Sequence, residues 1–423
     1  MFFHLMSFEQ YKDKLKTSTF SDFSEEFSRV RLIIDNVRQR GDQALYEYAL
    51  KFDQAKLDSL VVSKEEIKNA VAQIDPELLK TLDGAKENIE LYHRRQLRED
   101  WWESGPGWLT GQRVIPLQAV GAYVPGGTAA YPSSVLMTVL PARVAGVEKI
   151  YICTPPDKHG KINPVTLAAA EIAGASAVFK IGGAQAVAAL AYGTETVPRV
   201  QKIVGPGNIY VTLAKKEVFG QVGIDMLAGP SEIVIVADNG ANADFIAADL
   251  LSQAEHDPLS RSILVSTSEN LANRVAERLE EQILTLPRKE IAGRSLRERG
   301  GAIIVPSLEE AWPVVNEIAP EHLELHLEEA WRYLEKITSA GAIFIGSYSP
   351  EPLGDYWAGS NHVLPTGAAA RYASPLGVDD YMKKSSVIYY SKDVMKSAAG
   401  SIAALARAEG LEAHARAALI RRY

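Results

Sequence analysis

From Val114 onward, the chain alternates short apolar runs with alanine-rich stretches of helical pattern, and this rhythm constrains the fold more than any other feature. One block contains "AVGAYVPGG", "KIYICTPP", "VTLAAAEIAGA", "AVFKIGG" and "AQAVAALAYG", and a second contains "EIVIVAD", "SRSILVST", "ANRVAERLEEQI", "GAIIVP" and "GAIFIG". Strands alternating with helices form right-handed βαβ crossovers, which give a mostly parallel sheet covered on both faces. The sequence therefore predicts two three-layer α/β domains of related design that meet near "MLAGPSE".

The two ends of the chain depart from this pattern. In "SDFSEEFSRVRLIIDNVRQRGDQALYEYALKFD", apolar residues recur at intervals of three and four, which predicts two helices separated at Gly41. After about Ser374 the sequence becomes polar and then alanine-rich, in "DVMKSAAGSIAALARAEGLEAHARAALIRRY". We expect this tail to form helices that pack on something outside the two domains, such as a second subunit.

Charge and composition limit the partners of the chain. Its 423 residues, 47% of them hydrophobic, are enough for about two to three domains. A net charge of −8 with mixed signs leaves no basic face, which argues against nucleic acid as a partner. The start "MFFHLMSFEQ" does not have the pattern of a signal peptide, and no later apolar run could span a bilayer. We therefore expect no membrane association and a cytoplasmic location.

The single cysteine, Cys153, lies in the apolar run "KIYICTPP". A thiol that captures an aldehyde needs an accessible and electropositive site, and nothing around Cys153 indicates one. We expect Cys153 to be buried and without a catalytic role.

The stretch "LSQAEHDP" places polar side chains on the inward face of a helix end. The apolar stripe of the preceding "ADFIAADLL" continues at helical spacing into Gln253 and His256, whereas Glu255 points to another face. Pro258 ends the helix near Asp257, so Gln253 and His256 lie where backbone carbonyls and the helix dipole favour a cation. The motif by itself still favours a simpler interpretation, in which Gln253 caps free carbonyls and His256 is a buried histidine.

Other candidate polar groups lie next to predicted strands. "GDYWAGSNHVLPT" places Asp355 and His362 in a loop after the strand "GAIFIG", where α/β proteins put functional loops. In "APEHLELH", Glu321 and His322 stand at a strand entrance, where a carboxylate and an imidazole can act as proton acceptors. A solvated Glu-His pair is an equally good interpretation. His326 is expected to be an ordinary strand residue, and the lack of an H-E-x-x-H motif argues against a zinc protease.

Three glycine-rich turns follow strand-like runs, in "VGAYVPGGTAAYP", "KIGGAQAVAAL" and "KIVGPGNIYV". Glycines allow backbone N–H groups to approach a phosphate, and a helix N-terminus that follows them favours an anion. None of the three matches G-x-G-x-x-G, so the residues alone leave two alternatives, phosphate loops or simple turns.

Taken together, these motifs resemble the histidinol dehydrogenase family. The matching strings include "VRQRGDQALYEYALKFD", "GAYVPGG", "GGAQAVAALAYGTE", "VGPGNIYV", "DMLAGPSE", "DLLSQAEHDP", "APEHLEL", "GDYWAGSNHVLPT" and "EGLEAHA". They run in the order of the family from about residue 37 to residue 414, which makes the resemblance specific although each string alone is weak.

The resemblance implies a cofactor set and a role for each matching residue. Zinc, one ion per subunit, would be bound by Gln253, His256, Asp355 and His414, the last contributed by the partner subunit of a homodimer with shared active sites. Glu321 and His322 would be the catalytic acid–base pair. NAD would be bound by Tyr123, Gln185 and Asn208. Substrate contacts would come from Ser231, Gln253, His256, His322, Asp355, His362, Glu409 and His414.

The resemblance also implies two Rossmann-like domains, of which the first is discontinuous. We expect an N-terminal helical arm over residues 1–24, and a first α/β domain over 25–122 and 231–376 that carries the metal and acid–base residues. A second, NAD-binding α/β domain would span 123–230. A C-terminal helical arm exchanged between subunits would span 377–423.

The chemistry implied is the two-step oxidation of L-histidinol, through L-histidinal, to L-histidine in histidine biosynthesis. His322 would remove the hydroxyl proton as hydride leaves, and Glu321 would activate water for the second oxidation. Three alternatives stay open: a related zinc and NAD dehydrogenase of another small hydroxy compound, a zinc hydrolase that needs no nucleotide, and a non-enzymatic protein that keeps only the fold. The matches at Ser231, Glu409 and His414 favour histidinol, and the presence of every metal and acid–base position disfavours a non-enzymatic role.

Overall fold

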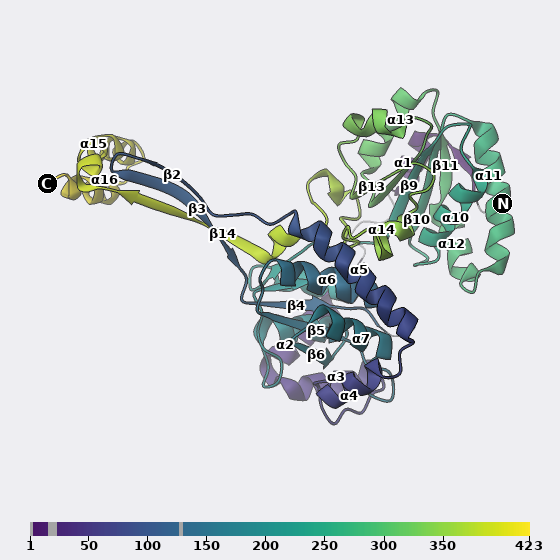
Figure 1. The fold of residues 1–423 in the computed structure, drawn as a ribbon, viewed down its shortest axis with the longest axis horizontal. Coiled ribbons are helices and arrows are strands. Elements are labelled where there is room, and N and C mark those ends of the chain that lie inside the picture. Colours follow the sequence, from purple (N-terminus) through teal and green to yellow (C-terminus); the bar gives the residue numbers. More distant parts are fainter. Residues whose placement is uncertain (1–2, 16–22, 127–129) are drawn as a thin grey trace.

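The structure is a computed structural model that describes residues 3–15, 23–126 and 130–423. It contains two parallel β-sheets, each in a separate globular unit, and an antiparallel sheet that forms a long arm (Figure 1). The predicted α/β fold with two mostly parallel sheets is confirmed. None of the helices in these three ranges combines the length and the apolar character that a bilayer-spanning segment needs.

The five-stranded sheet has the strand order β6-β5-β4-β7-β8, with every neighbouring pair parallel. Its strands are β4 (Ala119–Tyr123), β5 (Lys149–Thr154), β6 (Ala177–Lys180), β7 (Lys202–Val204) and β8 (Gly223–Ile224). One face packs on α2 (Ser24–Arg40), α3 (Asp42–Phe52), α8 (Gly183–Tyr192) and α9 (Ile209–Val218). The other packs on α4 (Lys64–Val71), α5 (Pro76–Arg94), α6 (Pro132–Val144) and α7 (Pro164–Ala173).

The six-stranded sheet has the order β1-β11-β10-β9-β12-β13 and is also parallel throughout. Its strands are β1 (Leu5–Met6), β9 (Glu232–Ala237), β10 (Arg261–Ser266), β11 (Gly301–Ile304), β12 (His322–His326) and β13 (Ala342–Ile345). One face packs on α10 (Ala243–Ala254), α11 (Glu269–Gln282), η2 (Ile283–Thr285) and α12 (Lys289–Arg299). The other packs on α1 (Phe8–Leu15), α13 (Leu308–Ile318) and η3 (Ala330–Lys336). Apart from β1, both sheets place their strands in the order third, second, first, fourth, fifth.

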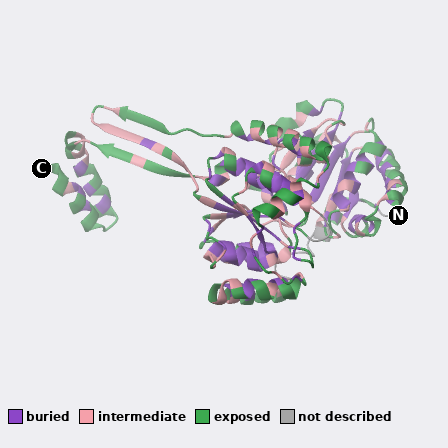
Figure 2. Ribbon diagram, turned by 60° about the horizontal axis from the view of Figure 1, so that its bottom comes forward, coloured by how far each residue is buried: buried purple, intermediate pink, exposed green. Residues whose placement is uncertain are grey.

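Both faces of the central strands are buried, and alternate side chains of each strand enter the cores on opposite faces of the sheet. In β9, Ile233 and Ile235 enter the core below α10, whereas Val234 and Val236 enter the core on the opposite face, because successive side chains of a strand point to opposite sides. Figure 2 shows these strands as buried ribbons between helices whose outer surfaces are exposed. A strand that is covered on both faces also buries its polar positions, and this matters for β12.

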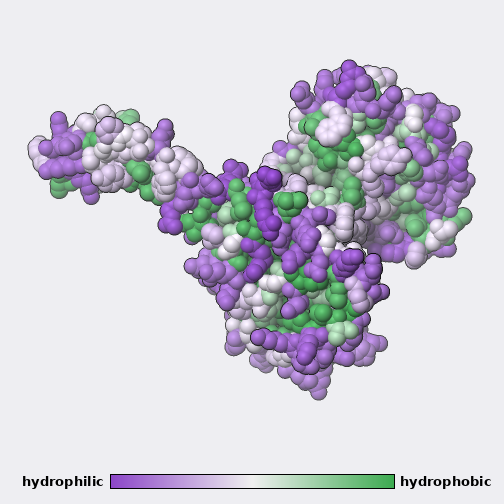
Figure 3. Space-filling view, in the orientation of Figure 1, coloured by the Kyte–Doolittle hydropathy of each residue, from purple (hydrophilic) through white to green (hydrophobic). Residues whose placement is uncertain are grey.

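The arm projects from the five-stranded unit and ends in the C-terminus (Figure 1). It consists of β2 (Trp101–Gly105), β3 (Trp108–Pro116) and β14 (Met382–Tyr390), followed by α15 (Lys392–Ala408), α16 (Glu412–Leu419) and η6 (Ile420–Arg422). β14 pairs antiparallel with β3 over its full length. Apolar side chains stay exposed on this arm, with Trp101 at 52%, Ile388 at 73% and Leu405 at 70%. In Figure 3 the surface of the arm is accordingly mixed, with green and pale areas between hydrophilic ones.

The grouping of segments differs from the expected domain boundaries. Residues 25–122 were expected beside 231–376, but α2 to α5 pack on the five-stranded sheet and β4 is its central strand. The expected helical arm over 1–24 contains a strand, β1, which pairs with β11; residues 1–2 and 16–22 of that segment lie outside the described residues. The C-terminal segment is not purely helical, because β14 shares its sheet with β2 and β3.

Candidate active site

Glu321 and His322 lie at the amino edge of the six-stranded sheet, where β12 begins beside β9. The backbone of Glu232 in β9 contacts both of them: its N–H donates to Glu321 Oε2 at 2.9 Å, and its carbonyl oxygen lies 3.1 Å from His322 Nδ1. Because a carbonyl can only accept, Nδ1 carries the proton of the neutral ring and Nε2 keeps its lone pair. The turn into β12 contains Ala319 in the left-handed region, with φ of 50°.

Burial sets the protonation states of this pair. Loss of solvent is the main cause that lowers the pKa of His322 to about 3, and the nearby imidazoles of His256 and His362 contribute to the same shift. Burial also raises the pKa of Glu321 well above its usual value, and the carboxylates of Glu232 and Asp355 add to this shift. His322 is therefore a neutral imidazole at physiological pH, with an unprotonated Nε2 available to accept a proton.

Several buried polar atoms of the site lack a hydrogen-bond partner among the described residues. They are both amide atoms of Gln253, Nε2 of His322 and Nε2 of His362. Gln253 is fully buried in the last turn of α10, as predicted. The helix ends at Ala254, about three residues earlier than expected, so His256 lies in the turn after the C-cap Glu255 and not in the last helical turn. Buried polar groups in proteins are nearly always satisfied, so these atoms indicate a ligand that binds nitrogen and amide oxygen donors.

Asp355 reaches the same place from another direction. Its Oδ1 lies 3.9 Å from His322 Nε2, and ligand atoms of His322, Glu351 and Asp355 all lie within 4.8 Å of one another. Asp355 was expected in a loop, but it stands in the short helix α14 (Glu351–Tyr356). Helical spacing places Glu351 one turn before Asp355. Burial, together with the nearby carboxyl group of Asp355, raises the pKa of Glu351 to about 8.

His362 connects the two globular units. It lies in an extended loop, and its side chain contacts the backbone of Ser133 at the start of α6. The preceding Asn361 is buried and donates to the Met137 carbonyl of α6 at 2.8 Å. Ser231, directly before β9, is half-buried and receives the Arg261 N–H on its carbonyl. The six-stranded unit thus presents its polar cluster to the α6 end of the five-stranded unit.

The residues that were predicted to bind a nucleotide all lie at or after the carboxyl ends of strands in the five-stranded sheet. This edge is the usual position for a ligand of a doubly wound sheet. Tyr123 ends β4, and its hydroxyl accepts from the Gly183 N–H at 3.1 Å. Gln185 is buried in the first turn of α8, and Asn208 caps α9 by accepting from two backbone N–H groups. Gly205 has φ of 107°, and a Cβ there would lie 2.2 Å from the Tyr123 carbonyl oxygen, so only glycine fits.

Glu409 and His414 are not brought to this site. Both lie exposed at the tip of the arm, Glu409 at the end of α15 and His414 in α16, far from α10 and α14 of the same chain (Figure 1). Within one chain, therefore, the fourth expected zinc ligand, His414, does not lie near the other three, Gln253, His256 and Asp355.

Sequence reasoning missed four groups at or behind the site. The backbone of Glu232 contacts Glu321 and His322, while its Oε1 accepts from the Gly367 N–H at 2.7 Å. Glu351 was absent from the expected set although it precedes Asp355 by one turn, a helical spacing that could have revealed it. Asp249 and Glu324 surround His326, which was expected to be an ordinary strand residue. The signal that could have revealed Asp249 and Glu324 was an acidic residue among the apolar residues of a predicted helix and of a predicted strand.

Comparison with known proteins identifies the relatives of this chain. A family model described as histidinol dehydrogenase matches residues 16–422. A histidinol dehydrogenase of Geobacillus kaustophilus is 56% identical over 405 residues, covering 95% of this chain and 96% of the relative. The chain belongs to the histidinol dehydrogenase family. This membership makes it an oxidoreductase of histidine biosynthesis, as the resemblance implied.

Two further histidinol dehydrogenases support this family membership. The one from Clostridium acetobutylicum is 51% identical over 414 residues, covering 98% of this chain and 96% of the relative. The crystal structure of histidinol dehydrogenase from Elizabethkingia anophelis superposes with a TM-score of 0.93 at 38% identity, covering 99% of this chain and 98% of that one. The arrangement of two α/β units and an arm is therefore the fold of the histidinol dehydrogenase family along the whole chain.

Proposed function

We propose that this chain oxidises L-histidinol through L-histidinal to L-histidine, with NAD as the hydride acceptor and one zinc ion per subunit. The observation that carries the proposal is the set of buried polar atoms of Gln253 and His322, beside Asp355, that have no hydrogen-bond partner within the described part of the chain. An imidazole, a carboxylate and an amide suit a borderline metal ion such as zinc, and amide oxygen is the least usual of these ligands.

The metal site would be held by Gln253, His256 and Asp355 of one subunit and by His414 of the partner subunit. Bound zinc would supply a Lewis acid for the nitrogen donors of L-histidinol. The burial that raises the pKa of Asp355 to about 7 makes a free carboxylate costly there, and a cation would remove that cost. The exposed apolar side chains of the arm support a homodimer in which each arm covers the site of the other subunit.

In the first oxidation, His322 would accept the hydroxyl proton on Nε2 as hydride moves from the alcohol carbon to NAD, giving L-histidinal and NADH. The Glu232 carbonyl holds the ring at Nδ1 and stabilises the charge that develops on it. Positioning of this kind lowers a barrier by several kcal/mol, because the reacting groups need not be brought together during the reaction. Ser231, His362 and Glu409 of the partner subunit would contact the substrate.

In the second oxidation, Glu321 would remove a proton from water as the water adds to the aldehyde. The hydrate then loses a second hydride to NAD and forms the carboxylate, so the reaction balances with two NAD consumed per histidinol. A carboxyl with a raised pKa is a stronger proton acceptor once ionised, which suits Glu321 to this role. The 2.9 Å hydrogen bond from the Glu232 N–H fixes one of its oxygens.

NAD would lie along the carboxyl edge of the five-stranded sheet, against Tyr123, Gln185 and Asn208. The contact between His362 and the Ser133 backbone supports this arrangement, because it sets the polar cluster against the end of the helix that follows β4. The five-stranded unit would therefore bind NAD, and the six-stranded unit would carry the metal and the acid–base residues. We place the enzyme in the cytoplasm, where NAD-dependent biosynthesis takes place.

Removal of the metal tests the proposal directly. We expect treatment with a chelator followed by gel filtration to abolish NADH formation from L-histidinol and NAD, and stoichiometric zinc to restore it, because the substrate nitrogens lose their anchor. Absorbance at the NADH band measures the rate. A metal-free enzyme with full activity would refute the zinc site. Hydrolysis of an ester or amide without NAD would instead support the zinc hydrolase, and NADH only from another hydroxy compound would support the related dehydrogenase.

Cys153 should be dispensable. It is fully buried, and burial raises the pKa of its thiol, which suppresses the thiolate that would attack an aldehyde. We expect Cys153→Ala to keep most of the rate of both oxidations, with a modest loss of stability from the small cavity. Steady-state kinetics with L-histidinol and with L-histidinal measure this. Near-complete loss of the second oxidation, with fold and zinc intact, would contradict the water-based scheme.

A further inference from the structure

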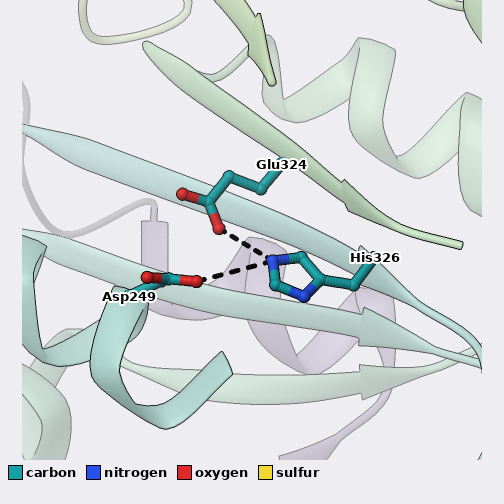
Figure 4. A group of neighbouring side chains, drawn as sticks. All are labelled: Asp249, Glu324 and His326. Carbon is teal, nitrogen blue, oxygen red and sulfur yellow. Dashed lines mark hydrogen bonds and ion pairs between the residues drawn. The ribbon is translucent and has the colours of Figure 1, made fainter. Parts of the chain in front are cut away.

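A buried ionic cluster lies behind the candidate site and takes no part in the chemistry described above. Figure 4 shows that Asp249 and Glu324 both direct a carboxylate oxygen to Nε2 of His326. The oxygen of Glu324 lies 3.2 Å from this nitrogen and that of Asp249 lies 3.5 Å from it. All three side chains are nearly or fully buried. We call this cluster the Asp249–His326–Glu324 triad.

The triad is a charged unit in the core of the six-stranded domain. Burial disfavours the imidazolium of His326, but the hydrogen bonds to Asp249 and Glu324 outweigh it and raise the pKa to about 9. A buried ion cluster is poor evidence for stability, because desolvation offsets most of the attraction. Such clusters are better explained by the geometry that they impose, since removing one member leaves an unpaired charge in the core.

The triad joins the three elements that carry the proposed metal and acid–base residues. Asp249 stands in α10, one turn before Gln253. Glu324 stands in β12, two residues after His322 on the same side of the strand. The other oxygen of Glu324 accepts from the Glu351 N–H at 2.7 Å, which fixes the first residue of α14.

A second hydrogen bond links α10 to α14 close to the proposed metal ligands. Ser252, next to Gln253, donates to Glu351 Oε2 at 3.1 Å. Glu351 in turn stands one turn before Asp355 in α14. Ser252 and Glu351 therefore help to fix the spacing between the amide of Gln253 and the carboxylate of Asp355, and Glu351 does so in part through a side-chain hydrogen bond to Asp355 itself.

We propose that the Asp249–His326–Glu324 triad positions the metal ligands, and that His326 is the residue on which zinc affinity depends although it does not bind zinc. The inference rests on the zinc site of the proposed function. Outer groups that orient metal ligands typically change metal affinity by about 10- to 100-fold when they are removed. The triad is not itself a second metal site, because a single imidazolium nitrogen already lies between the two carboxylates.

The test measures zinc affinity by chelator competition on the full-length protein. Replacing His326 by Leu removes the bridge, and we expect the zinc dissociation constant to rise about 10- to 100-fold. His326→Gln keeps an amide N–H near the position of Nε2, and we expect it to stay within a few-fold of the wild type. With cobalt bound at saturation, the visible spectrum of His326→Leu should differ from that of the wild type, because the ligands shift.

Leu279→Ala is the matched control. Leu279 is fully buried on α11 in the same domain, away from the triad, and its truncation destabilises the core without touching the ligands. We expect its zinc dissociation constant to stay within about twofold of the wild type, whatever its loss of stability. If His326→Leu does not fold, Asp249→Asn replaces it; this variant keeps the shape and removes one charge, and it should weaken zinc severalfold.

The outcomes separate this inference from the proposed function. A wild type that binds no zinc, or a Gln253→Ala variant that binds it normally, overturns the zinc site and the inference with it. Weak binding by Gln253→Ala together with normal binding and a normal cobalt spectrum in folded His326→Leu or Asp249→Asn overturns the positioning role alone. Equal weakening in Leu279→Ala, or a second metal ion per subunit that disappears in His326→Leu, overturns it as well.

Discussion

Glu321→Gln should reduce the oxidation of L-histidinal by about 10²- to 10⁴-fold and leave the fold and zinc content unchanged. The amide cannot accept a proton from water, but it matches the carboxylate in shape and can still receive the Glu232 N–H on its oxygen. In the proposed scheme the first oxidation uses His322 rather than Glu321, so hydride transfer from L-histidinol should continue. Rapid mixing of the variant with L-histidinol and excess NAD should therefore give one NADH per site and then stall.

His322→Asn supplies the opposite control. Its amide N–H can still donate to the Glu232 carbonyl, but nothing replaces Nε2 as a proton acceptor. We expect the alcohol step to fall by about 10²- to 10⁴-fold, while added L-histidinal remains a better substrate than L-histidinol. If Glu321→Gln and His322→Asn slow both substrates equally, the division of roles between the two residues is wrong.

Mixed dimers give the second large effect. His414→Asn and Asp355→Asn should each lose activity by about a thousandfold or more, because each removes a ligand whose metal stabilises the reaction by several kcal/mol. If the proposed homodimer forms, co-expression of the two variants should give heterodimers in which one site combines Asp355 of one subunit with His414 of the other. We expect random mixing to restore about a quarter of the wild-type activity.

The position of the arm is the reason for this expectation. His414 is exposed in α16, and α16 lies at the end of a long projection, far from the α14 helix that carries Asp355 in the same chain (Figure 1). Coexpression of Asp355→Asn with Gln253→Ala is the control, since both ligands come from one subunit and heterodimers then carry a lesion in each site. Absence of rescue in the first pair, or equal rescue in both, would contradict a shared site.

The sequence predicts the layered fold well because the fold follows from local periodicity. Apolar runs such as "EIVIVAD" are buried on both faces, as a parallel sheet requires, and Gly41 separates α2 from α3 as expected. The predicted domain boundaries were wrong where strands distant in the sequence pair with one another. Nothing in the sequence near β2 and β3 indicates that β14, some 270 residues later, completes their sheet.

The candidate site was predictable in part for the same reason. The resemblance supplied the residues, and helical spacing placed Gln253 and His256 at the end of α10. That Asp355 lies 3.9 Å from His322 is a property of the folded chain, because α14 must return to the start of β12. His326 was expected to be an ordinary strand residue because alternation cannot tell a solvent face from a covered one; its burial beside Glu324 follows only from the parallel sheet.

The stoichiometry of NADH formed from limiting L-histidinol tests the central claim most directly. With zinc-loaded enzyme and excess NAD, the account predicts about two NADH per histidinol, with L-histidine as the product, because both hydrides leave in one site. One NADH per histidinol with free aldehyde would contradict the second oxidation, and no NADH at all would contradict the assigned activity.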